Sequence, residues 1–334
     1  MAPFTHRNRL LIVRWAIVSV VVTTALMAAD STFWLLLRFV TGVGSALVLV
    51  FVSSIVLERA AHHHQYSWPP LVFSGIGVGV AFSGLAVPIF VRMSGSRAAW
   101  IGIACISVIA VGLTVRYFID DTRPAKPLHS PIEQNLPKHR KTFVWLSAVY
   151  TGEAVAYIIP ATFLAAIVSR MSSIARYADL AWVLVGLAAA LATFPWIRAG
   201  ARLGKARSLA LALGVQAVGI VAPILGGGVF PVVIAALTLG GTFMAITLFA
   251  TGLAREIFPD RTSAAISRLT VLYALGQMIG PLIATQLALR TGTYDVALLM
   301  AGTIAGIAAI TTLITVHEPQ PEANVSPAQP PALT

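Results

Sequence analysis

Residues 37–46 read LRFVTGVGSA and place one arginine and several small residues inside an otherwise apolar stretch. Small residues, here Gly42 and Gly44 among others, let neighbouring membrane helices approach each other closely. A cation at membrane depth needs a partner or a water-filled cavity, which predicts a functional role for Arg38. The alternative is that Arg38, about one turn inside the edge of its stretch, extends to the membrane interface.

Ten apolar stretches follow one another along the chain. Each has about the 20 residues that a helix needs to cross the hydrocarbon core of a bilayer. The composition agrees, because 57% of the residues are hydrophobic and 10% are charged, with a mean hydropathy of +0.85. The sequence therefore predicts an all-α integral membrane protein without a sizeable soluble domain. The predicted spans are 10–29, 33–57, 69–91, 98–118, 143–168, 180–197, 208–226, 230–253, 265–288 and 296–316.

The spans form a group of four and a group of six. We expect an N-terminal bundle over 1–118, a flexible cytoplasmic linker over 119–142, a C-terminal bundle over 143–316 and a disordered cytoplasmic tail over 317–334. The first apolar stretch is long and lacks a clean small-x-small cleavage site, so it predicts a retained helix and not a secretory signal.

The positive charges predict the orientation. With the N-terminus placed in the cytoplasm, 17 of the 23 Lys and Arg residues fall on the cytoplasmic side and Arg38 falls in a span. Such an asymmetry is typical of cytoplasmic loops, which favours both termini on the cytoplasmic side of the membrane. The net charge of +11 thus belongs to short loops and does not indicate nucleic acid as a partner. The five basic residues on the other side are Arg92, Arg97, Arg170, Arg176 and Arg290.

Glu153 lies about 15 Å into its span, close to the middle of the bilayer. A carboxyl group at that depth is protonated, paired or in contact with water, and each state suits proton coupling or binding of a cationic or hydroxyl-bearing solute. The alternative is a neutral Glu153 that hydrogen-bonds to a neighbouring helix and serves packing.

Further polar side chains accompany Glu153. Tyr150 and Tyr157 lie three residues before and four residues after it, on one helical face, where they would line a polar cavity or make core hydrogen bonds. The amide of Gln277 is also near the midplane and can bind solute or bridge two helices. Gln216 and Thr162 are weaker candidates of the same kind.

Glycine pairs at small-xxx-small spacing predict close helix crossings that can slide or rock. Pro281 lacks a backbone donor and permits a kink inside its span. The glycine pairs are Gly75 with Gly79, Gly276 with Gly280, and Gly302 with Gly306.

These motifs together resemble the major facilitator superfamily. Residues 37–46 resemble the arginine-and-glycine motif of its fourth helix, and residues 195–207 (PWIRAGARLGKAR) resemble the basic loop between its eighth and ninth helices. Residues 157–164 and 275–281 are similar to helices seven and eleven of the YbfB/YjiJ-type subgroup, and residues 72–85 point the same way.

The resemblance implies helices in two six-helix bundles, of which this chain would lack the first two helices. Gly42, Gly44, Gly75, Gly79, Gly276, Gly280, Pro281, Arg202 and Arg207 would then serve helix packing and gating. The basic loop lacks the usual aspartate, which argues against a charge-relay role for that loop.

We therefore expect a secondary active transporter that moves a small organic solute by alternating access, coupled to protons. It would act as a monomer in contact with membrane lipid, without a cofactor, a metal or nucleic acid. The tract 62–64 (HHH) cannot direct three side chains at one ion from a regular helix, and Cys105 is the single cysteine. The alternatives are a ten-helix drug/metabolite exporter, an integral-membrane enzyme acting on a lipid-linked substrate, and a shortened chain that folds but does not transport.

Overall fold

The computed structural model describes residues 6–29, 32–62, 68–114, 136–171, 175–226 and 228–316, and these residues are helical almost throughout. The predicted tail 317–334, most of the predicted linker 119–142, and His63 and His64 lie outside the described residues. The helices are α1 (His6–Leu26), α2 (Trp34–His62), α3 (Trp68–Thr114), α4 (Leu136–Ser169), α5 (Ala178–Leu203), α6 (Lys205–Leu225), α7 (Val229–Ile257), α8 (Thr262–Thr291) and α9 (Asp295–Thr315), with short 3₁₀ turns at Ala175–Tyr177 and Pro259–Arg261.

Within the described part of the chain, seven helices, α3 to α9, are long and apolar enough to cross a membrane. Two shorter apolar segments, Leu10–Leu26 and Trp34–Leu49, lie in α1 and α2. Most of these helices extend a few residues past the predicted spans, because a helix continues beyond the hydrocarbon into the polar interface. The clearest case is α4, which begins at Leu136, inside the predicted linker.

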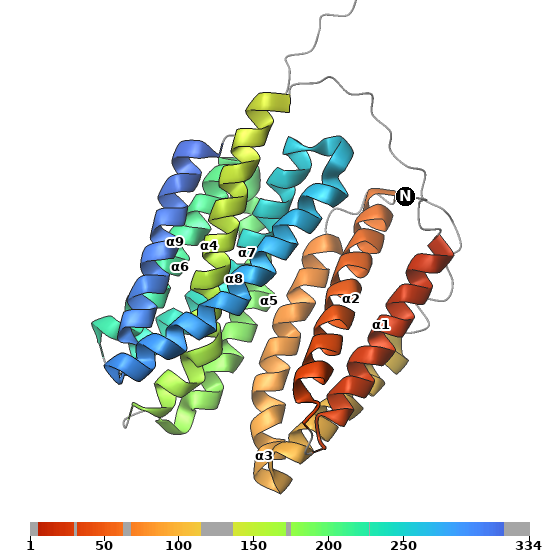
Figure 1. Cartoon of the computed structure of the whole chain (residues 1–334), viewed down its shortest axis with the longest axis vertical. Helices are drawn as coiled ribbons and strands as arrows, with labels where there is room; N and C mark the ends of the chain where they lie inside the picture. Colours follow the sequence, from red (N-terminus) through yellow and green to blue (C-terminus); the bar gives the residue numbers. More distant parts are fainter. Residues whose placement is uncertain are drawn as a thin grey trace, which may run out of the picture.

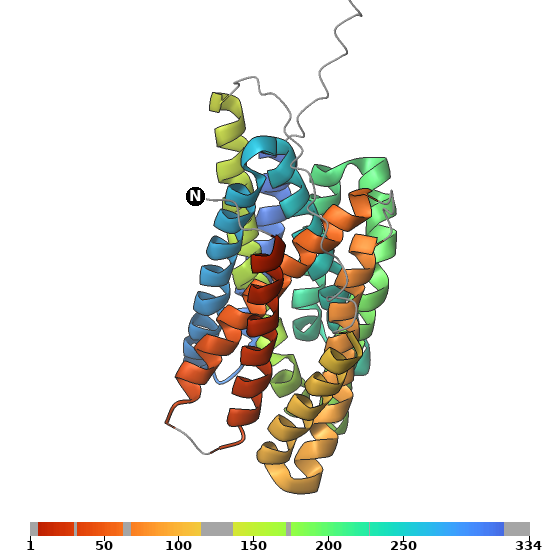
Figure 2. The ribbon, with the colours of Figure 1, turned by 90° about the vertical axis from the view of Figure 1, so that its right-hand side faces the viewer.

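The long helix α3 reverses direction at Ser94 and Gly95, whose backbone angles are not helical. Gly95 has a φ of 73°, a left-handed conformation that glycine adopts at little cost. The two arms of α3 meet at this turn (Figure 2), so α3 accounts for two of the predicted spans, 69–91 and 98–118.

The helices form two groups that lie side by side (Figure 1). In one group α1, α2 and α3 pack together, and in the other α4 packs against α5, α7, α8 and α9 while α6 lies between α7 and α9. Three clusters of buried apolar side chains fill the second group, around Leu213, Ala301 and Leu239. Large apolar side chains cover the outer surface, for example Trp15 and Leu35, as expected of a surface that faces lipid.

The main contact between the two groups is the pairing of α3 with α5. A Cβ atom on Gly77 of α3 would lie 2.7 Å from the carbonyl oxygen of Gly186 in α5. A Cβ atom on Gly186 would in turn lie 2.6 Å from the Cα atom of Ala81. The two backbones are thus in direct contact, as small residues permit. Beyond this crossing, Arg92 forms an ion pair with Asp179 at 3.7 Å.

Candidate functional site

Glu153 lies halfway along α4, the helix at the centre of the second group. Its side chain has no exposed surface. The carboxyl oxygen Oε1 accepts a hydrogen bond of 3.2 Å from the side-chain amide of Gln216 in α6. The other oxygen, Oε2, is buried and makes no hydrogen bond to any described residue. A buried acid whose partners among the described residues are all neutral groups is an unusual feature of a protein interior.

Gln216 connects Glu153 to a third helix. Its own amide oxygen accepts a hydrogen bond of 2.8 Å from the hydroxyl of Thr242 in α7, and both residues are almost completely buried. The Thr242 hydroxyl also lies 2.7 Å from the carbonyl oxygen of Thr238, so two acceptors share one donor. The chain of contacts from Thr242 through Gln216 to Glu153 fixes the amide orientation and joins α4, α6 and α7.

Aromatic side chains surround the same region. The ring of Tyr150 lies 4.4 Å from that of Tyr273 in α8, and its hydroxyl donates a hydrogen bond of 3.3 Å to Thr247. Tyr157 stacks on Phe243 of α7 with ring centroids 5.2 Å apart. Tyr273 also interacts with the carboxyl group of Glu153. Tyr157 and Tyr273 are only partly buried, so the aromatic groups extend from the buried acid toward the surface.

Gln277 is partly buried on α8, one helical turn after Tyr273 and on the same face. The other predicted polar residues lie elsewhere, and Thr162 is exposed on α4. Arg38 is exposed on α2, with its guanidinium group 4.7 Å above the ring of Trp100 in the second arm of α3. None of the contacts among the described residues joins Arg38 to Glu153. The structure thus brings together Glu153, Gln216, Tyr150 and Tyr157, and it leaves Arg38 and Thr162 apart from them.

Four residues of this site, namely Thr242, Thr247, Tyr273 and Phe243, were not predicted. Tyr273 carried a usable signal, because it lies four residues before Gln277 and therefore on the same face of α8. The threonines carried none, since threonine hydroxyls commonly bond to the carbonyl four residues earlier in their own helix, as Thr251 does.

The glycines predicted to pack differ in whether they lie against another helix. Gly276 and Gly280 of α8 lie against α4, where added Cβ atoms would be 2.7 Å from the Thr151 carbonyl oxygen and 3.0 Å from that of Val155. Pro281 follows directly, inside the same helix.

Other predicted crossings are corrected by the structure. Gly75 and Gly79 have no atom within 4 Å of an added Cβ, and Gly77 makes the contact in their place. Similarly, Gly44 packs against Ser19 of α1 while Gly42 faces open space, and Gly302 contacts α6 while Gly306 does not.

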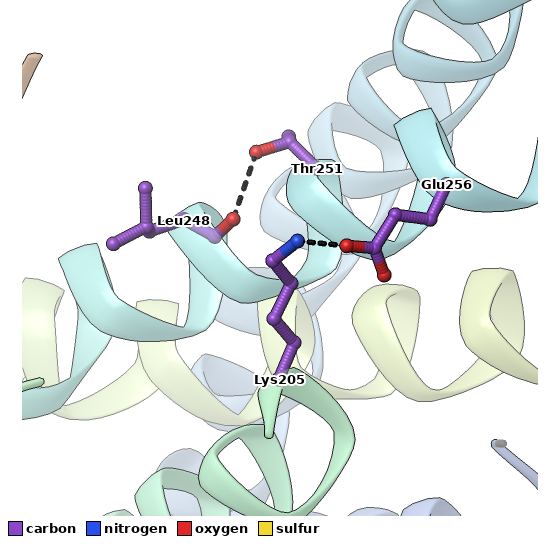
Figure 3. Close-up of polar contacts among 4 residues, drawn as sticks. All are labelled: Lys205, Leu248, Thr251 and Glu256. Atoms are coloured by element: carbon purple, nitrogen blue, oxygen red, sulfur yellow. Dashed lines mark hydrogen bonds and ion pairs between the residues drawn. The ribbon is translucent and has the colours of Figure 1, made fainter. Parts of the chain in front are cut away.

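The basic turn between α5 and α6 contains an ion pair that links α6 to α7. Lys205, at the start of α6, bonds to Glu256 near the end of α7, and Figure 3 shows this pair beside the hydrogen bond from Thr251 to the Leu248 carbonyl. Arg202 and Arg207 on either side of the turn are both exposed. Gly204 permits the turn itself, with a φ of 82°.

Comparison with known proteins decides the family. Residues 1–313 match the family model described as the uncharacterised MFS-type transporter YbfB, where MFS denotes the major facilitator superfamily. The chain belongs to this family of major facilitator transporters. The predicted resemblance and the predicted all-helical membrane fold are therefore confirmed, and a family of transporters does not support the membrane-enzyme alternative.

A solved structure of the Escherichia coli fucose:proton symporter FucP has a similar fold. The TM-score is 0.62 at 14% sequence identity, over 92% of this chain and 84% of that one. No curated protein matches the chain. The major facilitator fold of this YbfB-family chain is thus established, whereas its solute and its coupling ion are not specified by these similarities.

Proposed function

We propose that this YbfB-family chain is a proton-coupled secondary transporter, which moves a small organic solute across the bacterial inner membrane with both termini in the cytoplasm. Membership of a transporter family supports the transport of a solute. FucP, which shares the fold, is described as a proton symporter, so a protein of this architecture can use a proton gradient.

The burial of Glu153 is the observation that carries the proton-coupling proposal. The side chain has no exposed surface, so no water-sized molecule touches it in this conformation. A proton is the one ligand small enough to occupy the unpartnered oxygen Oε2. A carboxylate buried without a cation costs several kcal/mol, and protonation removes most of that cost. Glu153 thus holds a proton that is shielded from both sides of the membrane.

Movement of the two groups of helices relative to each other would provide alternating access. The group α1 to α3 would rock against the group α4 to α9 about the close crossing of α3 and α5. Rocking would open the partly buried side of the site, where Tyr157 and Gln277 lie, and expose it to water and solute in turn. Tyr157 and Gln277 are accordingly the proposed solute contacts, and Glu153 is the proposed proton carrier.

The experiment compares Glu153→Gln with wild type in proteoliposomes that are incubated with a labelled compound library under an imposed pH gradient. We expect wild type to accumulate at least one compound in a pH-dependent manner. Glu153→Gln keeps the size and one amide hydrogen bond but cannot release a proton, so its transport should lose the pH dependence. Glu256→Gln is the matched control, because that carboxyl is partly exposed and paired with Lys205.

Transport by Glu153→Gln with the pH dependence of wild type would assign Glu153 a packing role and refute its proton-carrying role. A wild-type transport rate that does not change with the pH gradient would refute proton coupling altogether.

A further inference from the structure

A groove runs along the outer surface between α6 and α9, which lie side by side in Figure 1. The two helices touch where Gly302 of α9 packs against α6, with the Ala217 carbonyl oxygen 3.3 Å from the position of a Cβ atom. From that crossing toward the first turn of α6 they leave a groove of about 500 Å³. Its walls include Ala210, Gly214, Ile310 and Leu313.

One charged residue marks the end of this apolar groove. Arg207 lines it from the first turn of α6, and the rest of the lining is apolar. The Arg207 side chain is exposed and forms no ion pair within the described part of the chain. A guanidinium group at a helix end is well suited to bind a phosphate group with two parallel hydrogen bonds.

The length of the groove matches one leaflet of a bilayer. Along α6 it extends from Arg207 to Val218, which is about 16 Å at 1.5 Å per residue. Half of the hydrocarbon core of a bilayer is about 15 Å thick. A chain that starts at the membrane surface beside Arg207 would therefore end near the midplane.

We propose that the groove between α6 and α9 binds an anionic phospholipid, with one acyl chain in the groove and the phosphate on Arg207. The apolar walls, the leaflet-long dimension and the single cation at the surface end fit this ligand together. Basic sites between transmembrane helices bind anionic lipid headgroups by the same combination of charge and apolar contact.

Native mass spectrometry of the delipidated full-length chain tests the proposal, with phosphatidylglycerol and phosphatidylcholine as the two probes. Wild type should bind phosphatidylglycerol more tightly than phosphatidylcholine by about fivefold, as expected for one basic residue at the membrane surface. Arg207→Gln should abolish this preference. Arg202→Gln is the matched control, since Arg202 is also exposed in the same basic turn but does not line the groove.

A second variant tests the apolar part of the site. Gly214 has no atom within 4 Å of an added Cβ, so Gly214→Leu can fill the groove without disturbing the fold. It should weaken the binding of both lipids, while circular dichroism stays unchanged. Equal lipid preference in Arg207→Gln and Arg202→Gln would overturn the proposal. So would undiminished binding to Gly214→Leu, or a dimer that Gly214→Leu disrupts, because a second copy would then be the occupant.

Discussion

At the scale of single residues, the amide of Gln216 has the greatest structural consequence, because it donates a hydrogen bond of 3.2 Å to the buried Glu153 carboxyl. The two residues are 63 positions apart in sequence, so this contact also ties α6 to α4. The local arrangement therefore depends on a hydrogen bond that water cannot replace.

Gln216→Leu should destabilise the protein by about 1–3 kcal/mol, since it removes the amide donor of the buried Glu153 carboxyl. The Thr242 hydroxyl loses one of its two acceptors and keeps the Thr238 carbonyl oxygen. The free energy of unfolding in mixed detergent micelles measures the effect. Gln277→Leu makes the same chemical change at a partly buried amide and should cost less. If both variants lost the same stability, the hydrogen bond between Gln216 and Glu153 would not be the cause.

The sequence identified Glu153 and Gln216 because polar groups are rare and costly at membrane depth. It did not identify Thr242 or Tyr273 as their neighbours. Those residues come from α7 and α8, and only the packing of four helices brings them to the same place. Sequence spacing reports neighbours within one helix, whereas contacts between helices depend on the rotation of each helix about its axis.

At the scale of secondary-structure elements, the crossing of α3 and α5 is the contact about which we propose that the two groups move. The glycines of α3 show that the sequence does not determine which face of this helix packs against α5. Gly75, Gly77 and Gly79 alternate along α3, so small residues occur on opposite faces of the helix. The sequence predicts a close crossing at Gly75 and Gly79, whereas the structure has it at Gly77 on the opposite face. The sequence could not tell which face makes the contact, because nothing in α3 alone specifies where α5 lies.

Gly77→Ala should therefore destabilise the protein relative to Gly75→Ala by about 1–3 kcal/mol, the usual cost of inserting an atom into a filled contact. Both variants gain the same helix propensity, so the difference in their unfolding free energies isolates the clash with the backbone of α5. Of these two glycines, only Gly77 would bring an added Cβ into contact with another helix. Equal stabilities would mean that α3 and α5 do not cross at Gly77.

The ion pair between Lys205 and Glu256 should contribute little to stability, although it links α6 to α7. Its side chains are 40% and 36% exposed, and a pair with that access to water is worth about 1 kcal/mol or less. A double-mutant cycle with Lys205→Ala and Glu256→Ala measures the coupling energy. A coupling of several kcal/mol would show that the pair is shielded from water and has a larger structural role.

At the scale of the whole molecule, the order and number of apolar helices follow from hydropathy, because length and composition decide whether a segment can cross a bilayer. The turn in the middle of α3 was predictable for the same reason, since polar and small residues separate two apolar segments there. The packing of α3 on α5 was not predictable, because it depends on contacts between segments far apart in sequence.

The orientation of the whole molecule can be tested with cysteines in a variant that has Cys105 replaced by alanine. Arg202→Cys and Thr293→Cys are both at exposed positions, at the turn between α5 and α6 and at the turn between α8 and α9. The distribution of Lys and Arg predicts that a membrane-impermeant thiol reagent added outside intact cells labels Thr293→Cys alone. Labelling of Arg202→Cys alone would reverse the proposed orientation.

Infrared difference spectroscopy of the full-length chain in lipid bilayers tests the proton on Glu153 most directly, and it requires no knowledge of the solute. We expect wild type at neutral pH to show the carbonyl band of a protonated carboxyl group, and Glu153→Gln to lack this band while Glu256→Gln retains it. A spectrum of Glu153→Gln identical to that of wild type in this region would show that Glu153 holds no proton, which contradicts the proposed mechanism.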